Sequence, residues 1–166
     1  MKEEVEKEIK IGDRLLNECD YKGAIARYNK AIKLDPTTKE AYFGKAEASI
    51  CIPKVSTEEI LALYRKAIEL DQNNAYYYTR LGAFCLDAGK FDIAEESYNK
   101  AAEIDKENAG YYYSEFGFEY YIKATAQLDE EASNEELDRI RKKALEYILK
   151  AMEMSEEDVI RLFSKK

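Results

Sequence analysis

Two runs of three consecutive tyrosines are the most distinctive chemical groups in this sequence of 166 residues. They occupy residues 76–78 and 111–113, and in each run a glycine follows the last tyrosine by four positions. Phenols grouped in this way could serve catalysis or ligand binding, or they could be the bulky side chains that begin a repeated helical unit. The interval of about 35 residues between two equivalent runs favours the repeated unit.

The other reactive groups form no pattern that is typical of catalysis or metal binding. The sequence contains no histidine, which is the commonest general base near neutral pH and the commonest transition-metal ligand. The three cysteines, Cys19, Cys51 and Cys85, lie far apart and form no Cys-x-x-Cys pair. The acidic stretch 129–136 could bind calcium weakly, but it lacks the alternating oxygen ligands and central glycine of a known calcium loop. We therefore expect no enzyme activity, no metal and no cofactor.

The charge balance limits the choice of partner. With 34 acidic and 26 basic residues, the net charge of -8 repels phosphate backbones and anionic lipids. No apolar run approaches the roughly 20 residues that a membrane-spanning helix needs, and the amino terminus is charged, unlike a signal peptide. An odd number of scattered cysteines suits reduced, partly buried thiols. We expect a cytoplasmic protein without nucleic-acid binding or membrane insertion, whose partner is an apolar or basic polypeptide.

The elements that carry these groups read as helices, because only two prolines and seven glycines interrupt an apolar pattern with a period near 3.6. A Tyr-x-Lys-Ala motif begins at Tyr28, Tyr64 and Tyr98, at intervals of 36 and 34 residues. A small or apolar residue precedes each tyrosine by four positions, so it shares one helical stripe with the tyrosine and the alanine. The alanine allows a neighbouring helix to approach closely.

A second helix is expected upstream of each stripe, with a small residue near its middle: Gly12, Ala46, Gly82 or Gly117. Glycine inside a helix costs up to ~1 kcal/mol relative to alanine. Its recurrence therefore needs a packing reason, and a close helix crossing supplies one. The chain is expected to form tandem helix pairs that stack through these small residues.

This pattern resembles the tetratricopeptide repeat family, whose unit of about 34 residues is a helix-turn-helix. Residues 75–108 match the unit without a gap, through Tyr78, Leu81, Gly82, Cys85, Ala94, Tyr98, Ala101 and Ile104. The resemblance implies an all-α, right-handed α-solenoid of about four repeats and a C-terminal capping helix, forming a single domain over residues 1–166. The expected repeats are at about residues 5–38, 39–74, 75–108 and 110–154, and the capping helix is at about 156–165.

Two repeats depart from the regular length. Residues 39–74 carry two extra residues in the turn, and the fourth unit matches only after an insertion of about 16 residues. Ser-x-x-Glu at 56–59 and at 133–136 predicts a capping box at the start of each following helix. In the fourth unit we expect a long first helix to about Gln127, a short acidic turn and a long second helix from about Asn134.

The resemblance implies a different position for each of the three tyrosines of a run, because adjacent helical residues point about 100° apart. The third tyrosine of each run, Tyr78 or Tyr113, is expected at the large core position. The second, Tyr77 or Tyr112, should face the previous repeat. Only the first tyrosine of each run leans toward the concave side, where the family's first helices line a groove. The resemblance assigns the following residues to that groove: Ile9, Asp13, Leu16, Phe43, Glu47, Ile50, Tyr76, Thr79, Arg80, Ala83, Leu86, Tyr111, Ser114, Phe118 and Tyr121.

Such a lining could hold an extended or helical peptide with apolar anchors, whose lysine or arginine residues meet the groove's carboxylates. We expect a non-catalytic interaction module, acting as an adaptor or a chaperone-like protein. Alternatively, the protein's own terminal helix or a second copy could fill the groove. A scaffold that self-associates through its terminal repeats, giving a homo-oligomer, is the second hypothesis.

One subtype of the family binds the acidic carboxyl-terminal tails of chaperones through a clamp of Lys, Asn and Arg residues. At the corresponding positions this sequence has Ile9, Asp13, Gly44, Tyr76 and Arg80. Only the arginine is retained. We therefore expect no binding of such an anionic tail.

Overall fold

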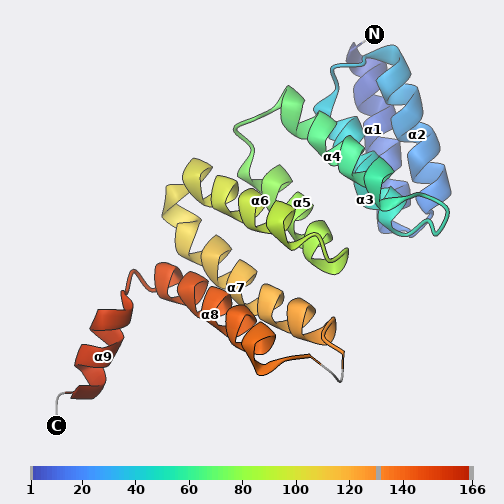
Figure 1. Ribbon diagram of the computed structural model, residues 1–166. Helices are drawn as coiled ribbons and strands as arrows, with labels where there is room; N and C mark the ends of the chain where they lie inside the picture. The colour runs from blue at the N-terminus through green and yellow to red at the C-terminus, as the bar shows by residue number, and fades with distance from the viewer. Residues whose placement is uncertain (1, 130–131, 165–166) are drawn as a thin grey trace. The chain divides into compact units, whose positions relative to one another are not determined.

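The computed structural model describes residues 2–129 and 132–164, and within those ranges every regular element is helical (Figure 1). The sequence expectation of an all-α chain is confirmed. The helices are α1 (Lys2–Asn17), α2 (Tyr21–Leu34), α3 (Lys39–Ile50), α4 (Thr57–Leu70), α5 (Ala75–Asp87), α6 (Phe91–Ile104), η1 (Lys106–Asn108), α7 (Ala109–Ala126), α8 (Asn134–Ala151) and α9 (Glu156–Ser164).

The chain divides into two compact units, Met1–Tyr77 and Tyr78–Lys166. The boundary falls inside α5, so the third expected repeat contributes to both units. In the first unit, α1 packs against α2 and α3, and α3 packs against α4. In the second unit, α7 packs against α6 and α8. The single domain expected from the sequence stays a prediction.

The helix starts follow local side-chain chemistry. Ser56 and Glu59 form a reciprocal capping box at α4, in which each side chain bonds the other residue's backbone N–H. Ser133 and Glu136 do the same at α8. Both predicted boxes are confirmed. The expected long helices of the fourth unit are confirmed as well, since α7 ends at Ala126 and α8 begins at Asn134.

The small residues of the first helices make room for tyrosines of the second helices. A Cβ atom added at Gly12 would lie 2.7 Å from Cε1 of Tyr28, a ring with no exposed surface. At Gly82, an added Cβ would lie 2.7 Å from Cδ2 of Tyr98, which is equally buried. Because interiors are close-packed, neither ring can move aside freely. The predicted packing reason for these glycines is confirmed.

Aromatic rings form much of the core of the second unit. The ring of Phe116 on α7 lies 4.5 Å from that of Tyr147 on α8 and 5.8 Å from that of Tyr98 on α6, measured between centroids. Phe116 also stacks on Tyr120 at 5.5 Å. These contacts join α7 to both of its neighbours and fix which face of α7 points outward.

The depths of the consecutive tyrosines differ from the sequence expectation. Tyr77 and Tyr112 are buried, at 6% and 9% exposure, whereas Tyr78 and Tyr113 are only partly buried. The second tyrosine of each run is therefore the deeper one, although the third was expected at the large core position. Tyr113 nevertheless contacts the ring of Tyr147, at 6.0 Å.

The buried residues of α1 include a carboxylate, Glu8, which is 3% exposed. Its carboxylate accepts hydrogen bonds from Lys30 at 2.7 Å and from Arg27 at 3.2 Å, both on α2. The bond from Lys30 and, after it, the bond from Arg27 lower the pKa of Glu8. A paired carboxylate thus fills the place where the other repeats have a large apolar side chain.

The three cysteines, all in the described part of the structure, form no disulfide, and their burial differs. Cys85 is buried, as expected of a core position, whereas Cys19 and Cys51 are exposed. The expectation of partly buried thiols was therefore wrong for these two. Cys19 has a φ of 60° just after α1, and Cys51 directly follows α3, so both lie where the chain leaves a helix.

A terminal helix follows α8, as the sequence predicts. Ser155 and Asp158 exchange hydrogen bonds at its start, with Asp158 accepting from the Ser155 backbone N–H at 2.9 Å. The side chains of Val159, Leu162 and Phe163 lie outside the described part of the structure, so covering of the last pair by α9 stays a prediction.

Candidate partner-binding surfaces

The outward face of α7 carries four large apolar side chains, which we call the α7 aromatic face. Tyr111, Phe118, Tyr121 and Ile122 are exposed by 59%, 61%, 39% and 55%. Residues seven, ten and eleven positions after Tyr111 return to the same side of a helix, because each residue turns by about 100°. Helix geometry alone therefore gathers these residues on one side.

The opposite side of α7 is equally apolar, but it is used by the core. Tyr112, Phe116, Gly117 and Tyr120 are buried there. The hydroxyl of Tyr112 donates to Asp105 at 2.8 Å, and burial together with this bond raises the pKa of Tyr112 to about 12. A helix that is apolar on both sides but buried on one leaves the other available for a partner.

A second aromatic cluster lies in the first unit. Tyr76 is 58% exposed, and its ring lies 5.4 Å from that of Phe43 on α3. Phe43 stacks on Tyr77 at 4.6 Å and meets Tyr64 edge-on at 5.9 Å. Burial raises the pKa of Tyr77 to about 12. The cluster thus supports one exposed ring, Tyr76, on three less exposed ones, while Ile50 at the end of α3 is also exposed.

A recess of about 620 Å³ lies in the same unit, between α1 and the start of α3. Ile9 and Val5 supply apolar surface, and Asp13, Glu6 and Glu40 supply carboxylates. Its complete lining is Lys2, Val5, Glu6, Ile9, Lys10, Asp13, Asp35, Thr37, Thr38, Lys39, Glu40 and Leu70. The Lys39 ammonium is already paired with Asp71 at 2.6 Å. The recess therefore combines apolar side chains with charges of both signs, and its carboxylates could meet a basic side chain.

Buried tyrosines hold two of the predicted carboxylates in place. The hydroxyl of Tyr28 donates to Asp13 at 2.8 Å, and the hydroxyl of Tyr64 donates to Glu47. Burial and, after it, the bond to Asp13 raise the pKa of Tyr28. Tyr28 thus connects α2 to α1, and Tyr64 connects α4 to α3. These carboxylates are thus positioned by the core and are not loose surface charges.

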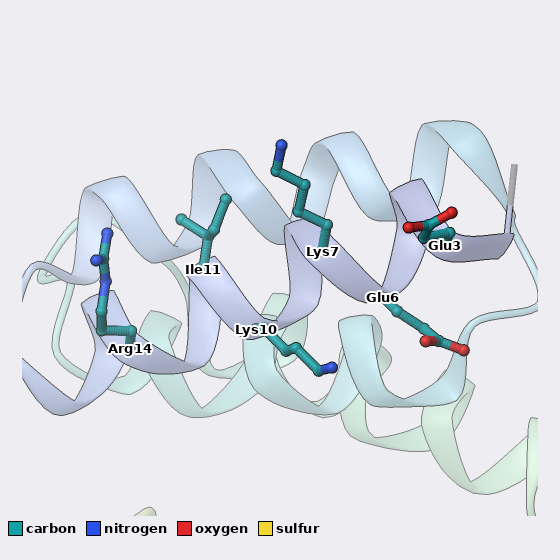
Figure 2. Close-up of a pocket in the computed structure, with 6 residues that line it drawn as sticks. All are labelled: Glu3, Glu6, Lys7, Lys10, Ile11 and Arg14. Carbon is teal, nitrogen blue, oxygen red and sulfur yellow. The ribbon is translucent and has the colours of Figure 1, made fainter.

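The outer face of α1 has a different character. A recess of about 450 Å³ has lining residues that all belong to α1. Figure 2 shows their side chains. Charged side chains of both signs surround Ile11: Glu3, Glu6, Lys7, Lys10 and Arg14. A polar outer face is what a terminal repeat of a stacked array needs.

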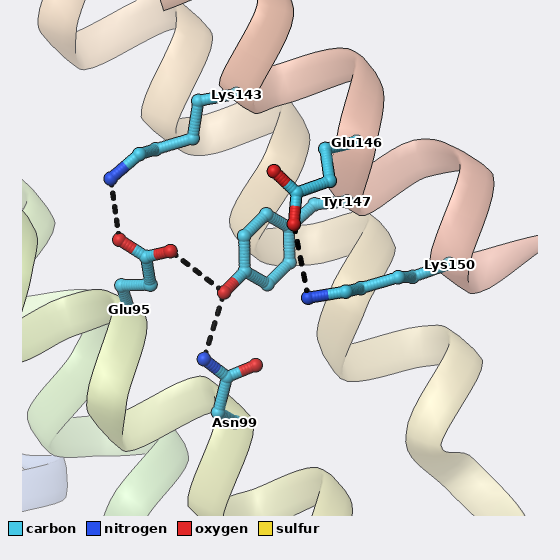
Figure 3. Close-up of polar contacts among 6 residues, drawn as sticks. All are labelled: Glu95, Asn99, Lys143, Glu146, Tyr147 and Lys150. Atoms are coloured by element: carbon cyan, nitrogen blue, oxygen red, sulfur yellow. Dashed lines mark hydrogen bonds and ion pairs between the residues drawn. The ribbon is translucent and has the colours of Figure 1, made fainter. Parts of the chain in front are cut away.

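Carboxylates between α6 and α8 are occupied by structural bonds (Figure 3). Glu95 accepts from Lys143 at 2.6 Å and from the hydroxyl of Tyr147 at 2.9 Å. The amide of Asn99 donates to the same hydroxyl at 2.8 Å. Burial is the main cause that raises the pKa of Tyr147. These bonds connect α6 to α8. Their arrangement is not that of a catalytic acid–base pair.

The predicted groove residues fall into two sets, one in each unit. Ile9, Asp13, Leu16, Phe43, Glu47, Ile50 and Tyr76 belong to the first, and Thr79, Arg80, Ala83, Leu86, Tyr111, Ser114, Phe118 and Tyr121 belong to the second. Most are at least partly exposed, but Leu86 is only 2% exposed. The side chain of Leu86 therefore offers almost no surface to a partner in this structure, and the groove assignment of the other residues stays a prediction.

Two residues of the α7 surface were missed by the sequence reasoning. Ile122 could have been found from its distance of eleven residues from Tyr111, which returns it to the same face. Glu115 could have been found from its register, since it lies 35 residues after Arg80, which the resemblance did place in the groove.

Comparisons with known proteins were consistent in the kind of protein they found. A model of the TPR repeat matches residues 12–48, and a model of the tetratricopeptide repeat matches residues 63–96. A search of curated protein sequences found no match. Within the described residues, no helix is long and apolar enough to cross a membrane, and no group of three metal-binding side chains comes together.

Several solved structures share the fold. A crystal structure of MamA is 26% identical, with a TM-score of 0.69, covering 94% of this chain and 81% of that one. The TPR2B domain of yeast Sti1, solved in a complex with pHsp70, is 22% identical with a TM-score of 0.58, covering 86% and 97%. YrrB, described as a TPR protein with an unusual peptide-binding site, is 20% identical with a TM-score of 0.58, covering 95% and 90%.

Proposed function

This chain belongs to the tetratricopeptide repeat family, and from that premise we propose that it is a non-catalytic module that binds a peptide or helix of another protein. The surfaces proposed for this binding are the outward faces of the first helix of each repeat. The adaptor or chaperone-like role, the absence of binding to acidic carboxyl-terminal tails and the cytoplasmic location stay predictions.

The observation that carries the proposal is the α7 aromatic face. Two of its rings, Tyr111 and Phe118, leave about three-fifths of their surface exposed. Both project from a helix whose other side is held by ring contacts on α6 and α8. Large rings on a rigid support lose little conformational freedom when they are covered, which suits them to anchor a partner.

The chemistry of the surfaces suggests the kind of peptide. Apolar side chains of a peptide would cover the exposed rings of the α7 aromatic face. In the other unit, the carboxylates of the α1–α3 recess would separately suit a basic side chain. The net charge of -8 favours the approach of a basic segment and opposes an acidic one. We therefore propose a partner segment with apolar anchors and at least one lysine or arginine.

Selection from a phage-displayed library of random peptides tests this function. The wild-type protein should enrich a family of apolar, basic peptides, and the variant Tyr111→Ser/Phe118→Ser should not enrich them. Leu145→Ser/Met152→Ser is the matched control, because these two side chains are similarly exposed but lie on or directly after α8. Thermal unfolding of both variants should stay close to that of the wild type. Failure of the wild type to enrich any peptide would contradict the proposal.

Self-association is a second candidate, favoured by apolar side chains near the end of the chain. Leu145, Met152 and Ile160 are exposed by 51%, 60% and 64%. A second copy that covered them would give a homo-oligomer whose contact lies away from the α7 aromatic face. Sedimentation at increasing concentration tests this: a dimer that Leu145→Ser/Met152→Ser abolishes would support it, and a monomer at every concentration would rule it out.

A further inference from the structure

The α7 surface contains one carboxylate whose bonding is incomplete. Glu115 lies four residues after Tyr111 and three residues before Phe118, on the same side of α7. Its side chain is partly buried. Its Oε2 atom is buried, and among the described residues no donor forms a hydrogen bond with it. Buried carboxylate oxygens normally have a donor, so this atom needs an explanation.

The groups around Glu115 come from three helices. Tyr111 and Glu119 lie on α7 itself, Tyr98 is on α6 and Arg80 is on α5. Burial raises the pKa of Glu115 and the negative charge of Glu119 raises it further, while the phenols and the charge of Arg80 lower it. Burial has the largest influence, so the surroundings incompletely compensate the negative charge of this carboxylate.

We propose that Glu115 accepts a hydrogen bond from a lysine or arginine side chain of the bound peptide. The rings of Tyr111 and Phe118 would pack along the aliphatic part of that side chain. This inference rests on the proposed function, and it names the residue that makes the α7 surface selective for a basic peptide.

Three features favour a cation over a neutral or anionic group. An ammonium or guanidinium supplies the donor that Oε2 lacks and a charge opposite to that of the carboxylate. Exposed tyrosine and phenylalanine faces attract cations. An anion would meet Glu115 and Glu119 on the same helix and would be repelled. Tyr111 is 59% exposed and its phenol interacts with Glu115, so this phenol would have to give way to the incoming cation.

The test compares two synthetic peptides with three forms of the protein. Both peptides have the core Leu-Phe-x-Phe-Leu, where x is lysine in one and norleucine in the other, and binding is measured by fluorescence anisotropy. The wild type should prefer the lysine peptide by about tenfold or more. Glu115→Gln should bind both peptides about equally. Glu119→Gln, which removes a charge one turn further along α7, should keep the preference.

The outcomes separate this inference from the proposed function. Equal binding of both peptides by the wild type, or an unchanged preference in Glu115→Gln, would overturn the role of Glu115 while leaving peptide binding intact. Binding of neither peptide by the wild type would contradict both. Glu115→Gln should be at least as resistant to urea as the wild type, because it removes a charge that the fold does not satisfy. Loss of folding in that variant would show a structural role and overturn the inference.

Discussion

Replacing Gly82 by alanine gives opposite predictions from helix propensity and from packing. In an open helix the change should stabilise by up to ~1 kcal/mol, because glycine loses more backbone freedom on folding than alanine. In this structure the new Cβ atom would lie 2.7 Å from Cδ2 and 2.8 Å from Cε2 of Tyr98. Those distances are far below van der Waals contact, and the ring has no exposed surface into which it could move.

The magnitude follows from the two opposing contributions. Forcing an extra carbon into a packed core costs ~1–3 kcal/mol. Subtracting the gain in helix propensity leaves a net loss of up to about 2 kcal/mol. For a chain of this size, a loss of 1 kcal/mol lowers the melting temperature by about 2–4 °C. We therefore expect Gly82→Ala to unfold at a lower temperature and a lower urea concentration than the wild type.

Urea denaturation followed by circular dichroism measures this change. The reverse substitution at the next position, Ala83→Gly, calibrates helix propensity at a partly exposed site of the same helix and should cost ~1 kcal/mol. If Gly82→Ala stabilised the protein by the amount that Ala83→Gly destabilises it, the close crossing of α5 and Tyr98 would be refuted.

Three further predictions concern other parts of the structure. Tyr147→Phe should lower the free energy of unfolding by about 1–2 kcal/mol in urea titrations, because it removes a buried hydroxyl with two bonds; an unchanged midpoint would contradict the arrangement in Figure 3. The pKa of Glu8 is lowered from 4.5, so its stabilisation is complete above that pH and is lost as the pH falls through its folded pKa. The urea midpoint of the wild type should therefore fall more steeply on acidification than that of Glu8→Gln, and parallel profiles would speak against the ion pairs. A soluble thiol reagent should label two cysteines quickly in the native protein, but Cys85 only on unfolding; rapid labelling of all three would show that the core is open.

The order and bounds of the helices were largely predictable, because the signals for them are local. The two Ser-x-x-Glu capping boxes, at Ser56 and Ser133, mark helix starts in the sequence and form the expected bonds in the structure. Gly12 and Gly82 were recognisable because glycine is unfavourable inside a helix unless something needs the space. For the capping boxes a short stretch of chain contains both the signal and its cause, whereas each glycine is a local signal of a contact with the next helix.

The depth of individual side chains was less predictable, because it depends on neighbouring helices. Tyr77 and Tyr78 are adjacent and chemically identical, but Tyr77 stacks on Phe43 of another helix and is the deeper one. Leu86 matched a groove position of the family, yet it is only 2% exposed. The lack of a hydrogen-bond donor for Oε2 of Glu115 depends on the packing of three helices, and no residue pattern within α7 predicts it.

The central claim is that Tyr111 and Phe118 are exposed in order to bind a partner. Isothermal titration calorimetry with one peptide from the phage selection tests it most directly. The dissociation constant should rise by about tenfold or more in Tyr111→Ser/Phe118→Ser, and should stay within about twofold in Leu145→Ser/Met152→Ser. Equal weakening in both variants, or unchanged affinity in the first, would contradict the account.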